Sequence, residues 1–204
     1  MSSPISQSAK DWDKRYSEAE SVWSLEPNQF VAAELFDYPV GKMVDIAGGE
    51  GRNALAFAGL GWQVENVEFS AVALEKFQAR AAAAGLTSKC FSNLSDAQSA
   101  KFAFQPSLVL IAYLQIPFAE LEKTLDNALS QMPQGTLFGV FHARRNLREG
   151  FGGPQSIEVL PSVEQLCDWA ERRGLDALIE ERFREVKTPT GVRQAIDLTL
   201  KVSR

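Results

Sequence analysis

Three glycines in one short segment are the residues of this sequence best suited to cradle a nucleotide. Gly48, Gly49 and Gly51 follow the apolar residues 43–46, and a helix-compatible segment, residues 54–58, comes next. Glycine permits positive φ angles and a close approach of the backbone to a ligand, and the free amides that open a helix donate hydrogen bonds at its positive dipole end. The pattern predicts a strand, a tight turn and a helix, with the turn as the nucleotide cradle.

Glu68 is the acidic residue that fits this cradle. It ends a second apolar segment, residues 62–69, and in a βαβ unit that position lies beside the first turn, where a carboxylate accepts the hydroxyls of a ribose. A solvated charge at a strand end is the plainer alternative. The cofactor itself stays open at this point, because residues 49–54, GEGRNA, also fit the dinucleotide pattern GxGxxG/A.

His142 is the only histidine, and histidine is the side chain that exchanges protons near neutral pH. It ends the apolar run of residues 136–142, and ligands of open α/β sheets bind at the carboxyl ends of strands. A basic, glycine-rich segment, residues 144–154, follows and is predicted to form a wall of the substrate pocket. We therefore hypothesise a catalytic His142, with a hydrogen-bonded structural histidine as the alternative.

The elements that must position these residues alternate along the chain. Apolar runs and period-two patterns predict strands at residues 43–46, 62–69, 88–92, 108–113, 136–142, 175–186 and 192–202. Helical periodicity and capping residues predict helices at residues 11–20, 28–36, 54–58, 70–84, 117–132 and 162–173. The last two strands read as an antiparallel hairpin, and alternation predicts a half-buried final strand. The Ser-rich residues 1–10 are predicted to be disordered.

Composition limits the classes of function. The 204 residues, 45% hydrophobic, fit one domain spanning residues 1–204. A net charge of -5 gives no global positive field, which disfavours a nucleic-acid partner, and no apolar run is long enough to cross a membrane. Cys90 and Cys167 lie in apolar contexts without a CxxC spacing and are predicted to be reduced core thiols of a cytoplasmic protein. With one histidine, no zinc site is expected.

Several segments together resemble the class I S-adenosylmethionine (SAM) dependent methyltransferases. Residues 45–54, DIAGGEGRNA, are similar to the first motif of that family, DLxCGEGRNA, and residues 61–76 to its second strand and helix. The stretches WDKRY and VWSLEPNQF resemble the amino-terminal segment of the small tellurite-resistance and thiopurine methyltransferase-like members. With AYLQIP and FGGPQ, the resemblance covers nearly the whole chain.

The resemblance implies methyl transfer from SAM to a small-molecule acceptor. It also implies an α/β, Rossmann-like doubly wound fold: a mostly parallel seven-stranded sheet with an antiparallel C-terminal hairpin strand and helices on both faces. Residues 1–36 would be a lid whose aromatic residues suit a sulfonium, and residues 37–204 the core. The cofactor-binding residues expected from the motifs and the resemblance are Trp12, Tyr16, Trp23, Asn28, Asp45, Ala47, Gly48, Gly49, Gly51, Asn53, Glu68, Phe69, Ser70, Asn93, Leu94, Ala112 and Tyr113.

Three positions depart from the family pattern. Gly48, Asn93 and Ser107 each replace a residue common in relatives; Asn93, followed by Leu94, stands where an aspartate usually receives the adenine amino group. A SAM-binding protein that has lost catalysis is therefore one alternative function. A nicotinamide oxidoreductase is another, although the formal Tyr-x-x-x-Lys pair of Tyr38 and Lys42 spans a proline and cannot project from one helix face.

Overall fold

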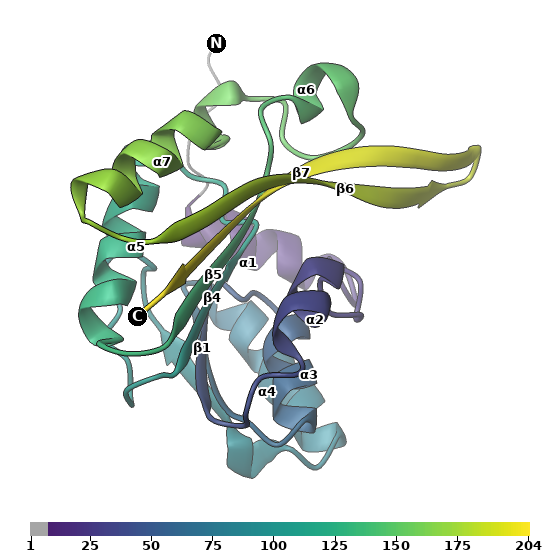
Figure 1. Ribbon diagram of the computed structural model, residues 1–204. Coiled ribbons are helices and arrows are strands. Elements are labelled where there is room, and N and C mark those ends of the chain that lie inside the picture. Colours follow the sequence, from purple (N-terminus) through teal and green to yellow (C-terminus); the bar gives the residue numbers. More distant parts are fainter. Residues whose placement is uncertain (1–7) are drawn as a thin grey trace.

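The computed structural model describes residues 8–204, and a seven-stranded sheet forms its centre (Figure 1). The strands are β1 (Lys42–Ile46), β2 (Gln63–Glu68), β3 (Cys90–Leu94), β4 (Leu108–Ala112), β5 (Thr136–His142), β6 (Ala177–Thr188) and β7 (Gly191–Ser203). Their spatial order is β3-β2-β1-β4-β5-β7-β6. The first five strands pair in parallel, whereas β7 is antiparallel to both of its neighbours. The predicted fold class is confirmed.

Helices cover both faces of this sheet. They are α1 (Ala9–Ser17), α2 (Gln29–Leu35), α3 (Arg52–Gly59), α4 (Ala71–Ala83), α5 (Phe118–Gln131), α6 (Asn146–Glu149) and α7 (Val163–Arg172), with short 3-10 turns at Thr87–Lys89 and Ile157–Val159. Buried residues of α5 and α7 pack on one face, and those of α2, α3 and α4 pack on the other (Figure 1). None of the helices in residues 8–204 is long and apolar enough to span a bilayer.

The central strands are apolar on both faces because both faces are covered. In β1, Val44 and Ile46 belong to one core cluster and Met43 to the other, and all three are fully buried. Such continuous burial is the expected signature of a parallel sheet between two helix layers. Because β1, β2, β4 and β5 run parallel, their carboxyl ends lie together at one end of the sheet, where the predicted site residues lie.

Two boundaries near the predicted site differ from the sequence expectations. The helix α1 begins at Ala9, where Ser8 and Asp11 form a capping box, so the predicted disorder is wrong for residues 8–10. The rest of that prediction, residues 1–7, lies outside the described residues. Strand β3 begins at Cys90, two residues later than predicted, because residues 87–89 form a 3-10 turn.

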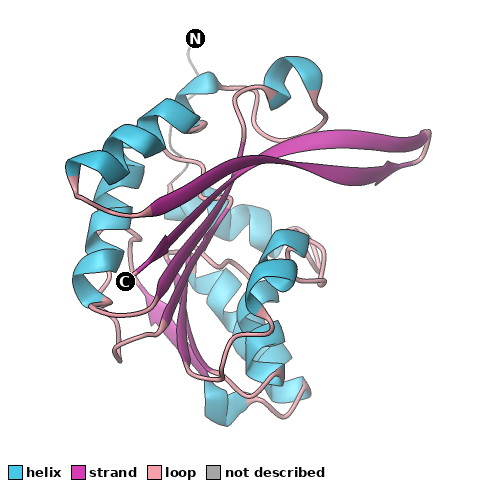
Figure 2. Cartoon of the chain, in the orientation of Figure 1, coloured by secondary structure: helices cyan, strands magenta, loops and turns pink. Residues whose placement is uncertain are grey.

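The C-terminal hairpin is longer and more buried than its pattern suggests. Only residues 197–203 of β7 pair with β5, so the first part of β7 pairs with β6 alone and forms an arm beyond the sheet (Figure 2). The segment from Ala195 to Leu200 is buried on both faces. The prediction of a half-buried strand is therefore wrong there, as is that of a core thiol for Cys167, which is exposed. Cys90 is buried as predicted.

Candidate functional site

A cavity of about 1110 Å³ opens at the carboxyl ends of the parallel strands. Its lining includes residues of β2, β4 and β5, the β1–α3 loop, the N-terminal segment and the loop of residues 151–154. Most of the residues expected from the sequence line this cavity: Trp12, Tyr16, Trp23, Asn28, Ala47, Gly48, Gly49, Asn53, Glu68, Phe69, Ala112, Tyr113 and His142. The cavity is large enough for a nucleotide-sized ligand together with a second small molecule.

Five expected site residues do not line the cavity: Asp45, Gly51, Ser70, Asn93 and Leu94. Asp45 is fully buried below the glycine turn. Gly51 caps α3 with a left-handed backbone, and a Cβ there would strike the Phe77 ring. Ser70 caps α4 through Ala73 N–H. These three residues support the cavity wall without lining it.

Asn93 and Leu94 lie away from the cavity because β3 ends two residues later than the sequence analysis placed it. The Asn93 amide donates to Glu65 at 2.6 Å and to the Lys101 carbonyl at 2.8 Å, and Leu94 is largely exposed. Asp96 lines the cavity instead. Asp96 was missed, although an acidic residue directly after a weakly apolar edge strand was the available signal.

The β1–α3 turn is a backbone structure held by Glu68. Ala47, Gly49 and Gly51 all have positive φ angles, of 54°, 57° and 79°. Glu68 Oε2 accepts from Gly49 N–H at 3.1 Å, and Oε1 accepts from the N–H groups of Phe69 and Ser70 at 3.0 Å each. Burial raises the pKa of Glu68. The carboxylate therefore joins the turn to the end of β2, and Glu68 is among the residues that line the cavity.

The departure at Gly48 has a local structural explanation. A Cβ at Gly48 would collide with Asn66 Oδ1 and would come within 2.9 Å of the Asp45 carboxylate. Asp45 and Asn66 are register partners on β1 and β2. Both Asp45 oxygens and Asn66 Oδ1 are buried without a hydrogen-bond partner among the described residues. This pair therefore fills the space that a side chain at position 48 would take. Burial raises the pKa of Asp45 to about 7.

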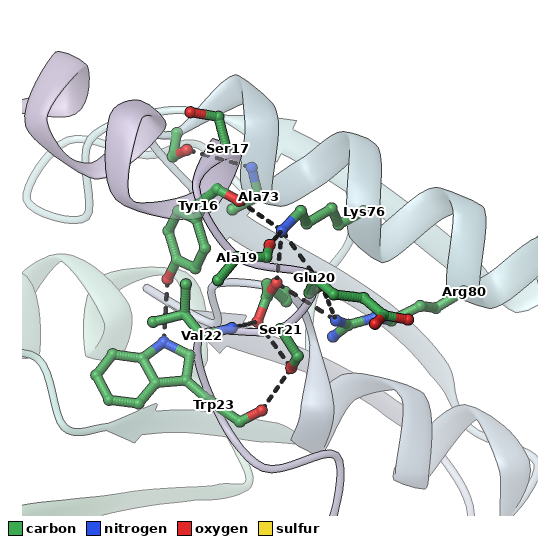
Figure 3. A network of polar contacts seen from close by, with 12 residues as sticks. Tyr16, Ser17, Ala19, Glu20, Ser21, Val22, Trp23, Ala73, Lys76 and Arg80 are labelled. Carbon is green, nitrogen blue, oxygen red and sulfur yellow. Dashed lines mark hydrogen bonds and ion pairs between the residues drawn. The ribbon is translucent and has the colours of Figure 1, made fainter.

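The N-terminal segment is attached to α4 at two points. Asp13 accepts from Ser70 Oγ and Val72 N–H at the start of α4. Further along α4, Lys76 Nζ donates to the carbonyls of Tyr16 and Ala19 (Figure 3). Lysine at the end of a helix satisfies carbonyls that lack an intrahelical partner.

Glu50 connects the same anchor to the glycine turn. Its carboxylate accepts from Val22 N–H at 3.0 Å, and lies 3.3 Å from both Lys76 Nζ and Arg80 Nη2. Tyr16, which is buried, lies over the turn: a Cβ on Gly49 would be 2.7 Å from its hydroxyl. The segment after α1 is thus one wall of the cavity, held by charges from α4 and the turn.

His142 belongs to a buried polar network at the other end of the cavity. His142 Nδ1 lies 3.0 Å from Asp197 Oδ1, while Asp197 Oδ2 accepts from Arg184 Nε at 2.7 Å and from the Tyr113 hydroxyl at 2.8 Å. Burial alone would raise the pKa of Asp197, but the hydrogen bonds from His142 and Arg184 bring it below its ordinary value. An ionised Asp197 makes Nδ1 the donor and leaves Nε2 as the acceptor.

Tyr113 holds the His142 ring in place. The two rings stack with centroids 4.6 Å apart. Gly153 packs so closely on the His142 ring that a Cβ at this position would lie 3.0 Å from it. Tyr113 has a φ angle of 61°, which is costly for a residue with a side chain. Asn28 Nδ2 donates to the Tyr113 hydroxyl at 3.1 Å, so the N-terminal segment also supports this network.

The departure at Ser107 lies outside the cavity lining. Ser107 precedes β4 at the opposite end of the strand, where its hydroxyl donates to the Lys42 carbonyl at 3.3 Å. Asp197 and Arg184, in contrast, were missed by sequence reasoning. Both come from the C-terminal hairpin, and only the insertion of β7 beside β5 brings them to His142.

Solved structures with the same architecture include proteins named as methyltransferases, and one named as a precorrin 8w decarboxylase. TehB from Haemophilus influenzae matches with a TM-score of 0.68 and 14% identity, over 94% of this chain and 66% of that one. The DhpI–SAH complex gives 0.65 and 16%, over 96% and 95%. The SAM-bound magnesium protoporphyrin IX methyltransferase of Synechocystis PCC 6803 gives 0.57 and 12%, over 96% and 79%. The chain has the methyltransferase fold. Neither a family model nor a curated protein sequence matches it.

Within the methyltransferase fold, the site has two chemically different ends. The end at β1 and β2 presents backbone amides and the Glu68 carboxylate. The end at β4 and β5 presents Tyr113 and the pair of His142 and Asp197. No group of three or more potential metal-ligating side chains is found within residues 8–204.

Proposed function

We propose that this protein transfers the methyl group of SAM to a small-molecule acceptor. The observation that carries the proposal is the pairing, in one cavity, of a nucleotide-type turn at Glu68 with a histidine and aspartate pair at His142 and Asp197. The methyltransferase neighbours support the same activity. SAM supplies a methyl group already activated by its sulfonium.

The residues at the β1–β2 end fit the cofactor. Glu68 has lone pairs for ribose hydroxyls, and Asp96, which follows β3 and lines the cavity, would receive the adenine amino group. The three orphaned acceptor oxygens of Asp45 and Asn66, below the turn, suit a buried donor or a water that bridges to an ammonium group. Trp12, Tyr16 and Trp23 give the N-terminal segment aromatic faces that favour a cation.

The residues at the β4–β5 end fit a proton-bearing acceptor. Asp197 fixes the tautomer and orientation of His142, so that Nε2 takes the proton from the acceptor atom. The walls from the N-terminal segment and from residues 151–154 exclude water and align the acceptor with the methyl group. In this assignment residues 8–36 are the lid and residues 37–204 the core.

Calorimetric titration and an acceptor screen test the proposal. We expect the protein to bind SAM and S-adenosylhomocysteine, its demethylated product, and not NAD. A screen of phenols, amines, thiols and acids with labelled SAM should then give a methylated product. Binding of NAD in preference to SAM would support an oxidoreductase, and SAM binding without turnover across the screen would support a binding protein that has lost catalysis.

A further inference from the structure

Among the described residues, two arginines that line the cavity have no acceptor for their guanidinium groups. Arg80 and Arg184 are paired, with Glu50 and Asp197 respectively. Arg15 and Arg52 also line the cavity, but neither makes a hydrogen bond or an ion pair with any residue in the range 8–204. Arg15 is exposed to solvent, whereas Arg52 is half-buried. A half-buried cation without a hydrogen-bonding acceptor is costly, which indicates that an anionic group of a ligand completes Arg52.

Arg52 is placed where a cation is unfavourable without a ligand. It is the first residue of α3, beside the positive end of the helix dipole, and it is half-buried. Burial lowers the pKa of Arg52. The Arg52 guanidinium carbon lies 5.7 Å from the centroid of the Tyr113 ring. The same ring stacks on His142, so Arg52 belongs to the end of the cavity that holds the proposed base.

Arg15 lies at the other end of the cavity. Its guanidinium carbon is 4.9 Å from the ring centroids of both Trp12 and Trp23. It lies in the last turn of α1, directly before Tyr16, which covers Gly49 of the glycine turn. SAM carries one carboxylate, and Arg15 is the arginine on the cofactor side. Arg52 lies beside Tyr113, which stacks on His142, so we assign it to the second substrate.

The charged side chains around the Tyr113 ring also indicate a site for an anion. Arg52 and Arg184 both lie within 6 Å of its ring, at 5.7 Å and 5.9 Å, whereas Asp197 is the one carboxylate that hydrogen-bonds its hydroxyl. The cavity lining also includes the apolar residues Phe151 and Val186. A chain of net charge -5 thus places two arginines beside one aromatic ring in this cavity.

We propose that Arg52 binds an oxyanion of the acceptor, so that the acceptor is a small acid with an apolar body. The oxyanion is the handle, and a separate hydroxyl or amine beside His142 is the atom that is methylated. A guanidinium holds a carboxylate through two parallel hydrogen bonds, which also fixes the orientation of the acceptor. This inference rests on the proposed function, because it assigns the acceptor of the same reaction.

The experiment uses benzoate as the probe and benzamide as its neutral control. Each is titrated by calorimetry into the full protein saturated with S-adenosylhomocysteine. Wild type should bind benzoate at least about tenfold more tightly than benzamide. Arg52→Gln should weaken benzoate binding by about tenfold to a hundredfold and leave benzamide and S-adenosylhomocysteine binding unchanged. Lys123→Gln, which removes an exposed charge from α5 outside the cavity, should change none of the three.

Arg15→Gln separates the two possible sources of the anion. We expect it to weaken S-adenosylhomocysteine binding and to spare the preference for benzoate. The proposal is overturned if wild type binds benzamide as well as benzoate, or if Arg52→Gln weakens cofactor binding and not benzoate binding. Should Arg52→Gln not fold, Arg52→Lys keeps the charge and should lose part of the benzoate affinity. Absence of S-adenosylhomocysteine binding to wild type would instead refute the proposed function.

Discussion

His142 and Asp197 are register partners on adjacent antiparallel strands, and His142 Nδ1 lies 3.0 Å from Asp197 Oδ1. The strand pairing therefore sets the direction of the imidazole ring, because both backbones are fixed by β5 and β7. Stacking on Tyr113 restricts the remaining rotation. An imidazole held in this way can present one ring nitrogen to a ligand without losing further side-chain freedom.

Replacing either member of this pair should lower turnover and spare cofactor binding. We expect His142→Gln to reduce kcat by about 100 to 10,000-fold with an acceptor that must lose a proton, and to flatten the pH profile near neutrality. Asp197→Asn should cause a similar loss, and the double variant should be little worse than either single one, because the two groups act as a unit. Steady-state kinetics and S-adenosylhomocysteine titrations check this. Wild-type turnover of His142→Gln from pH 5 to 9 would make His142 structural.

Glu68→Gln should weaken S-adenosylhomocysteine binding by about tenfold to a hundredfold, the equivalent of one charge-assisted hydrogen bond. The amide keeps the shape of the side chain but loses the charge. Its NH2 group would face backbone N–H groups that now donate to the Glu68 carboxylate. Glu65→Gln is the matched control. Glu65 is a buried glutamate of the same strand, bonded to Asn93 and Ala103 N–H outside the cavity. Equal affinities for both variants would remove Glu68 from the cofactor site.

Lys76→Met should loosen the N-terminal segment and leave the sheet folded. The substitution removes the donor to the Tyr16 and Ala19 carbonyls, at a cost of about 1 to 3 kcal/mol. We expect faster tryptic cleavage between residues 10 and 15 and weaker S-adenosylhomocysteine binding, with Lys123→Met as the control. A global loss of stability without a change in affinity would mean that residues 8–36 are a packing arm of the core.

Asp45 should make the stability of the ligand-free protein fall as pH rises. Burial raises its pKa from 3.8 to about 7. The folded state therefore holds more protons than the unfolded chain between these values, so the free energy of unfolding falls through that window by about 4 kcal/mol from this group. In Asp45→Asn that contribution is absent. Because asparagine resembles the protonated carboxyl, urea unfolding of both proteins from about pH 4 to pH 7 should show wild type losing stability relative to Asp45→Asn as pH rises, whereas a difference that stays constant with pH would contradict the prediction.

The sequence could predict the elements whose signal is local. The β1–α3 turn is visible because glycine is required where φ is positive, as at Gly49 and Gly51. Glu68 is visible because it ends the strand that follows the glycine turn and its helix. In contrast, β3 is an edge strand with mostly exposed residues, so its apolar pattern is weak and its end was misplaced. That error of two residues assigned Asn93 and Leu94 to the cavity in place of Asp96.

Other site residues depend on pairing between distant strands. Asp197 alternates with apolar residues in β7, and alternation alone indicates a solvent-facing position. It is buried because β7 inserts beside β5 and because Arg184 comes from the facing strand. Nothing local in the sequence encodes that register. The same holds for Arg52, whose lack of a partner is a property of the assembled cavity.

The double anchoring of the N-terminal segment bears on how fast ligands exchange. Swinging α1 away would break the Asp13 contacts and the Lys76 contacts together, and such concerted rupture is slow. The opposite wall contains two glycines with positive φ angles, Gly152 and Gly153, and they border His142. We expect the residence time of the product, and with it the maximal turnover rate, to be timed by residues 151–154.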